Sequence, residues 1–75
     1  MNLEAEVVRF RLAMLVHEMG AVVREARALH SLVDHLGEGW VEFTAYLGNA
    51  IDDLEEAFEE LDWLLGSMKR QEEAK

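Results

Sequence analysis

Acidic side chains crowd the second half of the chain, and their type and spacing come closest to supporting chemistry. Seven carboxylates fall within eleven residues: Asp52, Asp53, Glu55, Glu56, Glu59, Glu60 and Asp62. Carboxylate oxygens bind Mg²⁺, and a dense carboxylate surface also attracts basic partners. On a helix these side chains would cover the outer surface, where no closed metal cage can form. We therefore interpret the run as a solvated face or an electrostatic docking surface, with five candidate partner-binding residues: Glu55, Glu56, Glu59, Glu60 and Asp62.

The histidines and hydroxyls do not form a catalytic pattern. His30 and His35 are five residues apart and would diverge around a helix, while His30 and Asp34 share a face but lack a third ligand nearby in the sequence. No serine or threonine belongs to a nucleophile-activating pattern, and the chain has no glycine-rich phosphate loop and no cysteine. We predict that the protein is not an enzyme and that it holds no cofactor or metal.

One acidic spacing resembles a known metal site. The pattern Glu56-x-x-Glu59-x-x-Asp62 is similar to part of the acidic signature of MazG-type nucleotide pyrophosphatases, which are all-α and magnesium-dependent. The resemblance covers one or two helical turns and implies a hydrolase in which these carboxylates bind Mg²⁺. That family also uses a paired carboxylate motif on the preceding helix, where this chain supplies the single Glu18. The hydrolase is therefore the most remote of the functions considered.

Two unbroken helical seams must position all of these residues. Apolar residues recur alternately three and four apart, which is typical of coiled-coil packing. The first seam comprises Ala5, Val8, Leu12, Leu15, Met19, Val22, Ala26, Leu29, Val33 and Leu36, and the second comprises Trp40, Phe43, Leu47, Ala50, Leu54, Ala57, Leu61, Leu64 and Met68. Gly37-Glu38-Gly39 separates them. We predict one all-α domain over residues 1–75, an antiparallel two-helix hairpin with helix one over about 3–36, a turn at 37–39 and helix two over about 40–70; Asn2 would cap helix one.

A second apolar stripe beside each seam predicts self-association. The added residues are Val16 and Val23 in the first half and Thr44, Ile51, Phe58 and Leu65 in the second. An apolar arc of this width is more than a two-helix contact can cover, and half of the chain is apolar. A chain shorter than roughly 70–80 residues also gains little stability from one core alone. We predict a homodimer, or another homo-oligomer, in which hairpins form a four-helix bundle.

Two apolar features lie away from these seams. Leu3, Val7, Phe10 and Met14 are spaced four, three and four apart, and Trp63 stands among acidic residues. Exposed apolar groups of this kind often mark a protein interface. We predict a non-catalytic, self-associating adaptor or regulatory protein that binds a protein partner at one or both sites. Gly20 and Gly48 fall inside the helices, and we interpret both as tolerated on the outer surface, with close approach of another helix as the alternative.

The charge balance supports an alternative function. The net charge is −9, and residues 36–75 contain eleven acidic and three basic residues, whereas residues 1–35 contain five and four. Direct nucleic-acid binding is disfavoured because it needs a basic surface. The alternative is a small acidic inhibitor, of a phage type, whose second helix blocks a basic site on a nucleic-acid-processing enzyme. Without a cleavable signal or a long apolar stretch, we expect no membrane insertion and a cytoplasmic protein, unless it is exported without a cleaved signal.

The predicted architecture also resembles a family of exported proteins. Small acidic hairpins of the WXG100 class dimerise into four-helix bundles and leave the cell without a cleaved signal. The turn here reads Gly37-Glu38-Gly39-Trp40 and contains no Trp-x-Gly. An acid four positions after an aromatic, the export signal of the class, is also missing after Tyr46 and Trp63. A WXG100-like exported hairpin is accordingly a further alternative.

Overall fold

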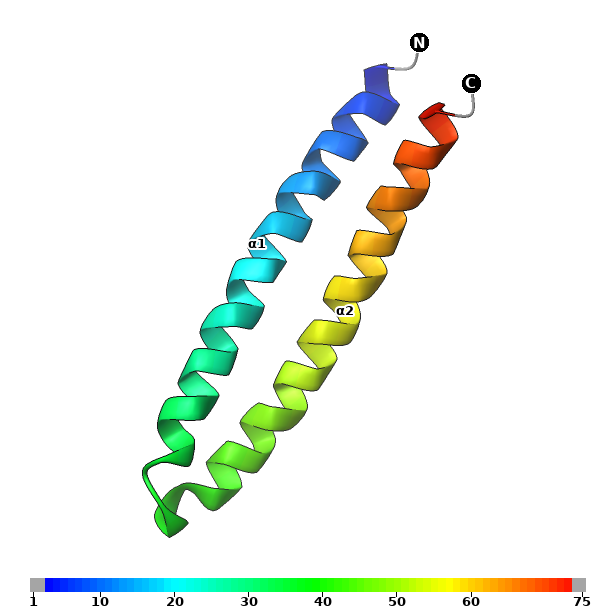
Figure 1. Cartoon of the computed structure of the whole chain (residues 1–75). Coiled ribbons are helices and arrows are strands. Elements are labelled where there is room, and N and C mark those ends of the chain that lie inside the picture. Colours follow the sequence, from blue (N-terminus) through cyan, green and yellow to red (C-terminus); the bar gives the residue numbers. More distant parts are fainter. Residues whose placement is uncertain (1–2, 74–75) are drawn as a thin grey trace.

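The computed structural model describes residues 3–73 and confirms the all-α hairpin (Figure 1). Helix α1 spans Leu3–Asp34, a short 3-10 helix η1 spans Glu38–Trp40, and helix α2 spans Val41–Glu73. The two long helices lie side by side and antiparallel, so the start of α1 and the end of α2 are at the same end of the molecule. The expected cap at Asn2 lies outside the described residues.

Helix α1 ends at Asp34, two residues before the predicted end at Leu36. The reason is a change of hydrogen bonding in the last turn, where the N–H of His35 donates to the carbonyl of Leu32 at 3.2 Å and the N–H of Leu36 donates to that of Val33 at 2.9 Å. Bonds over three residues tighten the turn and end the α-helix. Helix α2 begins at Val41 and runs three residues beyond the predicted end.

The reversal of the chain depends on Gly37. Its φ is 94° and its ψ is −163°, a backbone conformation that is essentially open to glycine alone. The carbonyl of Gly37 then accepts the N–H of Trp40 at 3.1 Å, which closes η1. The side-chain hydroxyl of Thr44 donates to the carbonyl of Trp40 at 2.8 Å, within the first turn of α2.

The helices meet along a seam that differs in part from the predicted one. Its most buried residues are Val23, Val33, Ile51 and Leu65, which are 4–9% exposed. Half-buried residues continue the same alternation of three and four between them: Leu12, Val16, Met19, Ala26 and His30 on α1, and Thr44, Leu47, Leu54, Phe58, Leu61 and Met68 on α2. This observed seam combines half of each predicted seam with the stripe beside it.

The other positions of each predicted seam lie outside the contact between the two helices, where Ala5 and Ala57 are half-buried and the larger side chains are exposed. The exposed members include Val8, Leu15, Val22, Leu29, Leu36, Trp40, Phe43 and Leu64. On α2, Leu47 and Leu54 belong to both the predicted and the observed seam. They are spaced alternately three and four residues from Ala50 and Ala57 on one side and from Ile51 and Phe58 on the other, so both combinations have the same spacing. On α2 the structure uses the neighbour with larger side chains, Ile51 and Phe58, rather than Ala50 and Ala57, because larger apolar groups bury more surface.

Gly20 and Gly48 are sites of close approach between the helices, so the alternative holds and the interpretation as outer-surface glycines was wrong. A Cβ at Gly20 would lie 3.4 Å from Cε1 of Phe58, and one at Gly48 would lie 3.4 Å from Nε2 of His30. Each glycine therefore lies beneath a ring from the opposite helix.

The hairpin is a thin rod with extents of 57 × 15 × 14 Å. Its radius of gyration is 17.0 Å, whereas a compact domain of 75 residues would have about 11 Å. Two helices side by side form a single layer, and a single layer leaves both of its broad sides open.

Candidate functional site

One broad side of the hairpin is polar. Arg27 of α1 and Glu55 of α2 bridge the helices there, with Nε and Nη2 of the arginine 2.7 Å and 2.6 Å from Oε1 of the carboxylate. Each of these residues directly follows a residue of the observed seam, Ala26 in α1 and Leu54 in α2. Side chains one position after the seam therefore meet on this side of the molecule. Glu55, a predicted partner-binding residue, is engaged within the chain.

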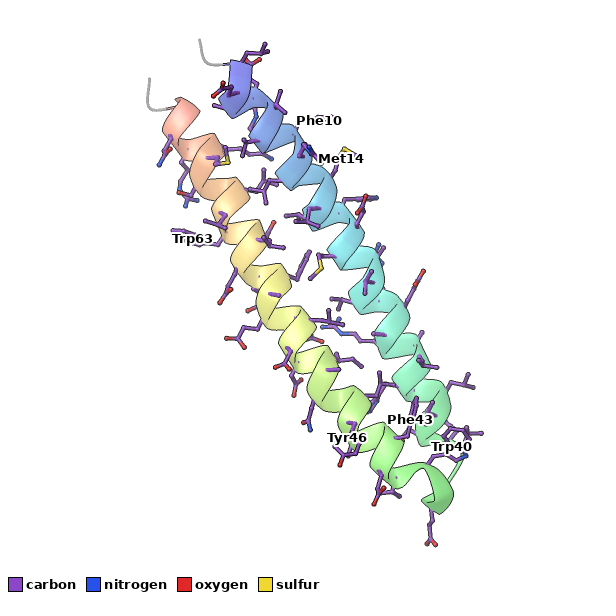
Figure 2. The ribbon with its side chains drawn as sticks, turned by 180° about the vertical axis from the view of Figure 1, so that it is seen from behind. Phe10, Met14, Trp40, Phe43, Tyr46 and Trp63 are labelled. Carbon is purple, nitrogen blue, oxygen red and sulfur yellow. The ribbon has the colours of Figure 1, made fainter. Side chains whose placement is uncertain are left out.

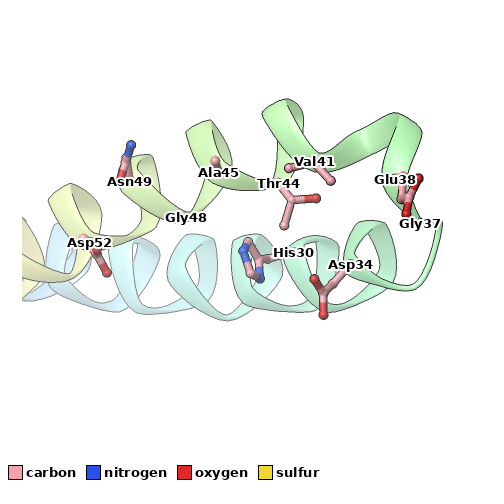
Figure 3. A pocket seen from close by; sticks show the side chains of 10 residues that line it. All are labelled: His30, Asp34, Gly37, Glu38, Val41, Thr44, Ala45, Gly48, Asn49 and Asp52. Carbon is pink, nitrogen blue, oxygen red and sulfur yellow. The ribbon is translucent and has the colours of Figure 1, made fainter.

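A hollow opens on the same side beside the turn (Figure 3). The ring of His30 fills its middle next to Gly48, and the carboxylates of Asp34, Glu38 and Asp52 are spread along its length. Among residues 3–73, no three histidine or acidic side chains come together as metal ligands. That statement covers the predicted Glu56, Glu59 and Asp62 pattern as well.

The opposite broad side is apolar, and we call it the flat face. It consists of Val8, Leu15, Val22, Leu29 and Leu36 from the first half and Phe43, Ala50, Ala57 and Leu64 from the second. Most members follow a residue of the observed seam by three positions, as Val22 follows Met19 and Ala57 follows Leu54. An α-helix turns by about 100° per residue, so a position one residue after the seam and a position three residues after it lie on opposite sides of the seam. Because the former positions meet on the polar side, the latter lie on the other side on both helices. The seven larger side chains of the flat face are 44–55% exposed.

An aromatic pair closes the turn end of the flat face. The rings of Trp40 and Phe43 meet edge to face, with centroids 5.7 Å apart and planes at 83°. Such pairs add to the stabilisation that burial alone provides. Both rings are nevertheless about half exposed in the single hairpin, so the pair has an open side.

The outer edge of α1 carries the predicted apolar stripe of Leu3, Val7, Phe10 and Met14, called the outer stripe below. These four side chains are 49–72% exposed. Trp63, at 63% exposed, projects from the outer edge of α2, and Figure 2 shows it on the opposite side of the hairpin from Met14. The outer stripe and Trp63 therefore belong to two separate surfaces.

The predicted acidic surface is divided around α2. Glu56, Glu59 and Glu60 lie with Trp63 and Leu64 around a shallow hollow on the outer edge. Asp62 follows the seam residue Leu61 and so turns towards the polar side, as Glu55 does. Asp62 also lines a second hollow together with Glu59 and Trp63, so four of the five predicted carboxylates lie beside Trp63.

Comparisons with known proteins do not assign the chain to a family. No protein-family model matches it, and no curated protein or solved structure is significantly similar to it. In the part from Leu3 to Glu73, neither helix is both long enough and apolar enough to cross a lipid bilayer.

Sequence reasoning missed the flat face as a surface in its own right. Its residues were assigned to the contact within the hairpin, although they recur at intervals of seven along both halves. A seven-residue repeat on three neighbouring stripes is a signal that a helix contacts more than one other helix.

Proposed function

We propose that this chain is a non-catalytic, self-associating protein–protein interaction module, an adaptor or regulatory protein whose hairpins pair into a four-helix bundle. The observation that carries the proposal is apolar surface on two different sides of a two-helix rod. One is the flat face between the helices, and the other is the outer stripe of α1. One apolar side suffices for pairing of hairpins, so the outer stripe remains for a different protein.

The outer stripe has the form of a helix that docks into a groove. Its four residues follow the spacing of apolar anchors on an amphipathic helix, over a length of about 17 Å at 1.5 Å per residue. Phe10 provides an aromatic anchor, and Met14 adds a flexible side chain that adapts to irregular pockets. The partner we propose is therefore a protein with an apolar groove or an apolar helix face.

The competing function is the acidic inhibitor, and the hollow around Trp63 is the observation that favours it. Glu56, Glu59 and Glu60 surround an exposed aromatic ring there. A partner with a basic patch and an apolar pocket would match this combination. The two functions use opposite edges of the hairpin, and variants on each edge distinguish them.

The test compares charge substitutions on the two edges. The tagged chain is used to isolate a bound protein, and its affinity for the purified partner is then measured by calorimetry. Met14→Glu should weaken binding at least tenfold, because a charge would be buried in an apolar contact. Ala28→Glu is the matched control, since it adds the same charge to an exposed position two heptads further along the same edge of α1.

The opposite result would overturn the proposal. If Met14→Glu binds normally and a variant combining Glu56→Lys and Glu59→Lys does not, the acidic edge is the binding site. The protein would then act as the acidic inhibitor.

A further inference from the structure

We infer that the flat face is covered by a second copy of this chain, which lays its own flat face against it. This inference rests on the self-association in the proposed function and adds the surface that forms it. It does not require a partner at the outer stripe or at Trp63, so it is tested independently of partner binding.

The composition of the flat face is that of an interface centre. None of its nine positions carries a charged or hydrogen-bonding side chain. Most of the next positions outward are charged, with Arg11, Glu18 and Glu25 on α1 and Asp53 and Glu60 on α2, while Leu32, Tyr46 and Ser67 occupy the others. A dry apolar middle with a charged rim is the usual anatomy of a protein interface. The polar side, with its ion pair between Arg27 and Glu55, has no such middle.

The area left open by the single hairpin matches what a dimer needs. The hairpin exposes 6079 Å², whereas a compact protein of its mass would expose about 4,700 Å². A stable interface buries roughly 800 Å² on each partner. Covering the flat face would therefore remove a large part of the excess and turn an open layer into a closed four-helix core.

The relief of the flat face favours a second copy over an unrelated protein. Gly20 beneath Phe58, and His30 over Gly48, fix the register of the helices and bring Val22 level with Ala57 and Leu29 level with Ala50. Around its middle the flat face thus has a short ridge of Val22 and Leu29 on α1 beside a short trough at Ala50 and Ala57 on α2, and Phe43 and Leu64 bound this trough at its two ends. A two-fold rotation places the ridge of each copy in the trough of the other, which is the self-complementarity that a symmetric interface requires.

The two tryptophans report separately on the two kinds of surface. Trp40 meets Phe43 edge to face at the end of the flat face, and Trp63 lies on the outer edge of α2. Trp63→Phe leaves Trp40 as the only tryptophan, and Trp40→Phe leaves Trp63. In the dimer, acrylamide should quench Trp40 several-fold less than in the diluted protein, while quenching of Trp63 should change much less with concentration.

Mass measurements on charge variants complete the test. Light scattering after size exclusion should give the mass of two chains for the wild type and for Ala28→Glu, and the mass of one chain for Leu29→Glu. The neighbours Ala28 and Leu29 are both exposed in the hairpin, but only Leu29 belongs to the flat face. If Leu29→Glu also loses helicity, the quenching of Trp40 in the otherwise unmodified chain still decides the question.

Two results would overturn the inference in different ways. If Leu29→Glu still forms a dimer and Trp40 remains accessible to acrylamide, the two copies pair through another surface. Self-association would then be correct, but its assignment to the flat face would be wrong. A helical monomer at all concentrations would remove self-association itself. Neither result bears on whether Met14→Glu abolishes binding of another protein.

Discussion

Gly37 carries the conformational demand of the whole turn. At φ 94° and ψ −163° any other residue is strained, and because no other group lies within 4 Å of a Cβ at this position, the strain is purely in the backbone. Gly37→Ala should therefore lower the free energy of unfolding by about 1–3 kcal/mol. The measurement is urea unfolding followed by circular dichroism at one fixed protein concentration.

Gly39→Ala is the control for this substitution. Gly39 also has open space around it, and Gly37 is the only described residue with a positive φ, so alanine at position 39 should leave stability unchanged or slightly raised. Equal losses in the two variants would contradict a conformational role specific to Gly37.

Single residues also show how far the candidate sites could be predicted. The exposure of Leu3, Phe10 and Trp63 follows from their spacing away from the seams, and the structure places them accordingly. The engagement of Glu55 was not predictable, because its partner Arg27 is 28 residues away and no local pattern links the two. Contacts between helices depend on register, and register is a property of the folded pair.

At the level of the secondary-structure elements, the sequence predicts the two helices well, but it predicts only part of the set of residues through which they contact each other. Alternating intervals of three and four encode helices with an apolar side, and the glycines around Glu38 encode the reversal. The choice between two equally spaced stripes is made by packing: the stripe with the larger Ile51 and Phe58 enters the contact, while Ala50 stays exposed and Ala57 is half-buried at its border. The spacing of apolar residues cannot distinguish the two stripes because both recur every seven residues.

The adjacent valines of α1 test the observed seam directly. Val23 is 5% exposed in the seam and Val22 is 45% exposed on the flat face. Val23→Ala should lower the free energy of unfolding by about 2 kcal/mol at every protein concentration, since it removes two buried methyl groups and leaves a cavity. Thermal unfolding at concentrations above and below dimer dissociation is the measurement.

Val22→Ala should behave differently from Val23→Ala. In the dissociated hairpin its effect should stay within about 0.5 kcal/mol, as is usual for exposed positions. At concentrations that favour the dimer the loss should grow, because the missing methyl groups belong to the contact between copies. If the two variants had the same effect at all concentrations, the division between seam and flat face would be wrong.

At the scale of the whole molecule, charge and apolar surface act against each other in the dimer. Each copy has a net charge of −9, and the rim of the flat face carries Glu18, Glu25, Asp53 and Glu60 against the single Arg11. Pairing two flat faces brings these acidic rims together. Repulsion between them opposes the apolar contact at low ionic strength, and it is screened as salt is added.

The dimer should consequently become tighter with salt, which is the reverse of an association held by ion pairs. Between 0.01 M and 1 M salt the screening length falls from about 30 Å to about 3 Å, so the dissociation constant measured by sedimentation equilibrium should fall. Glu60→Gln should tighten the dimer at low salt and reduce its salt dependence. Glu56→Gln, on the outer edge of the same helix, should do so less, because its charge lies farther from the other copy. A dimer that weakens with salt would mean that attraction between opposite charges, and not an apolar face with an acidic rim, holds the two copies together.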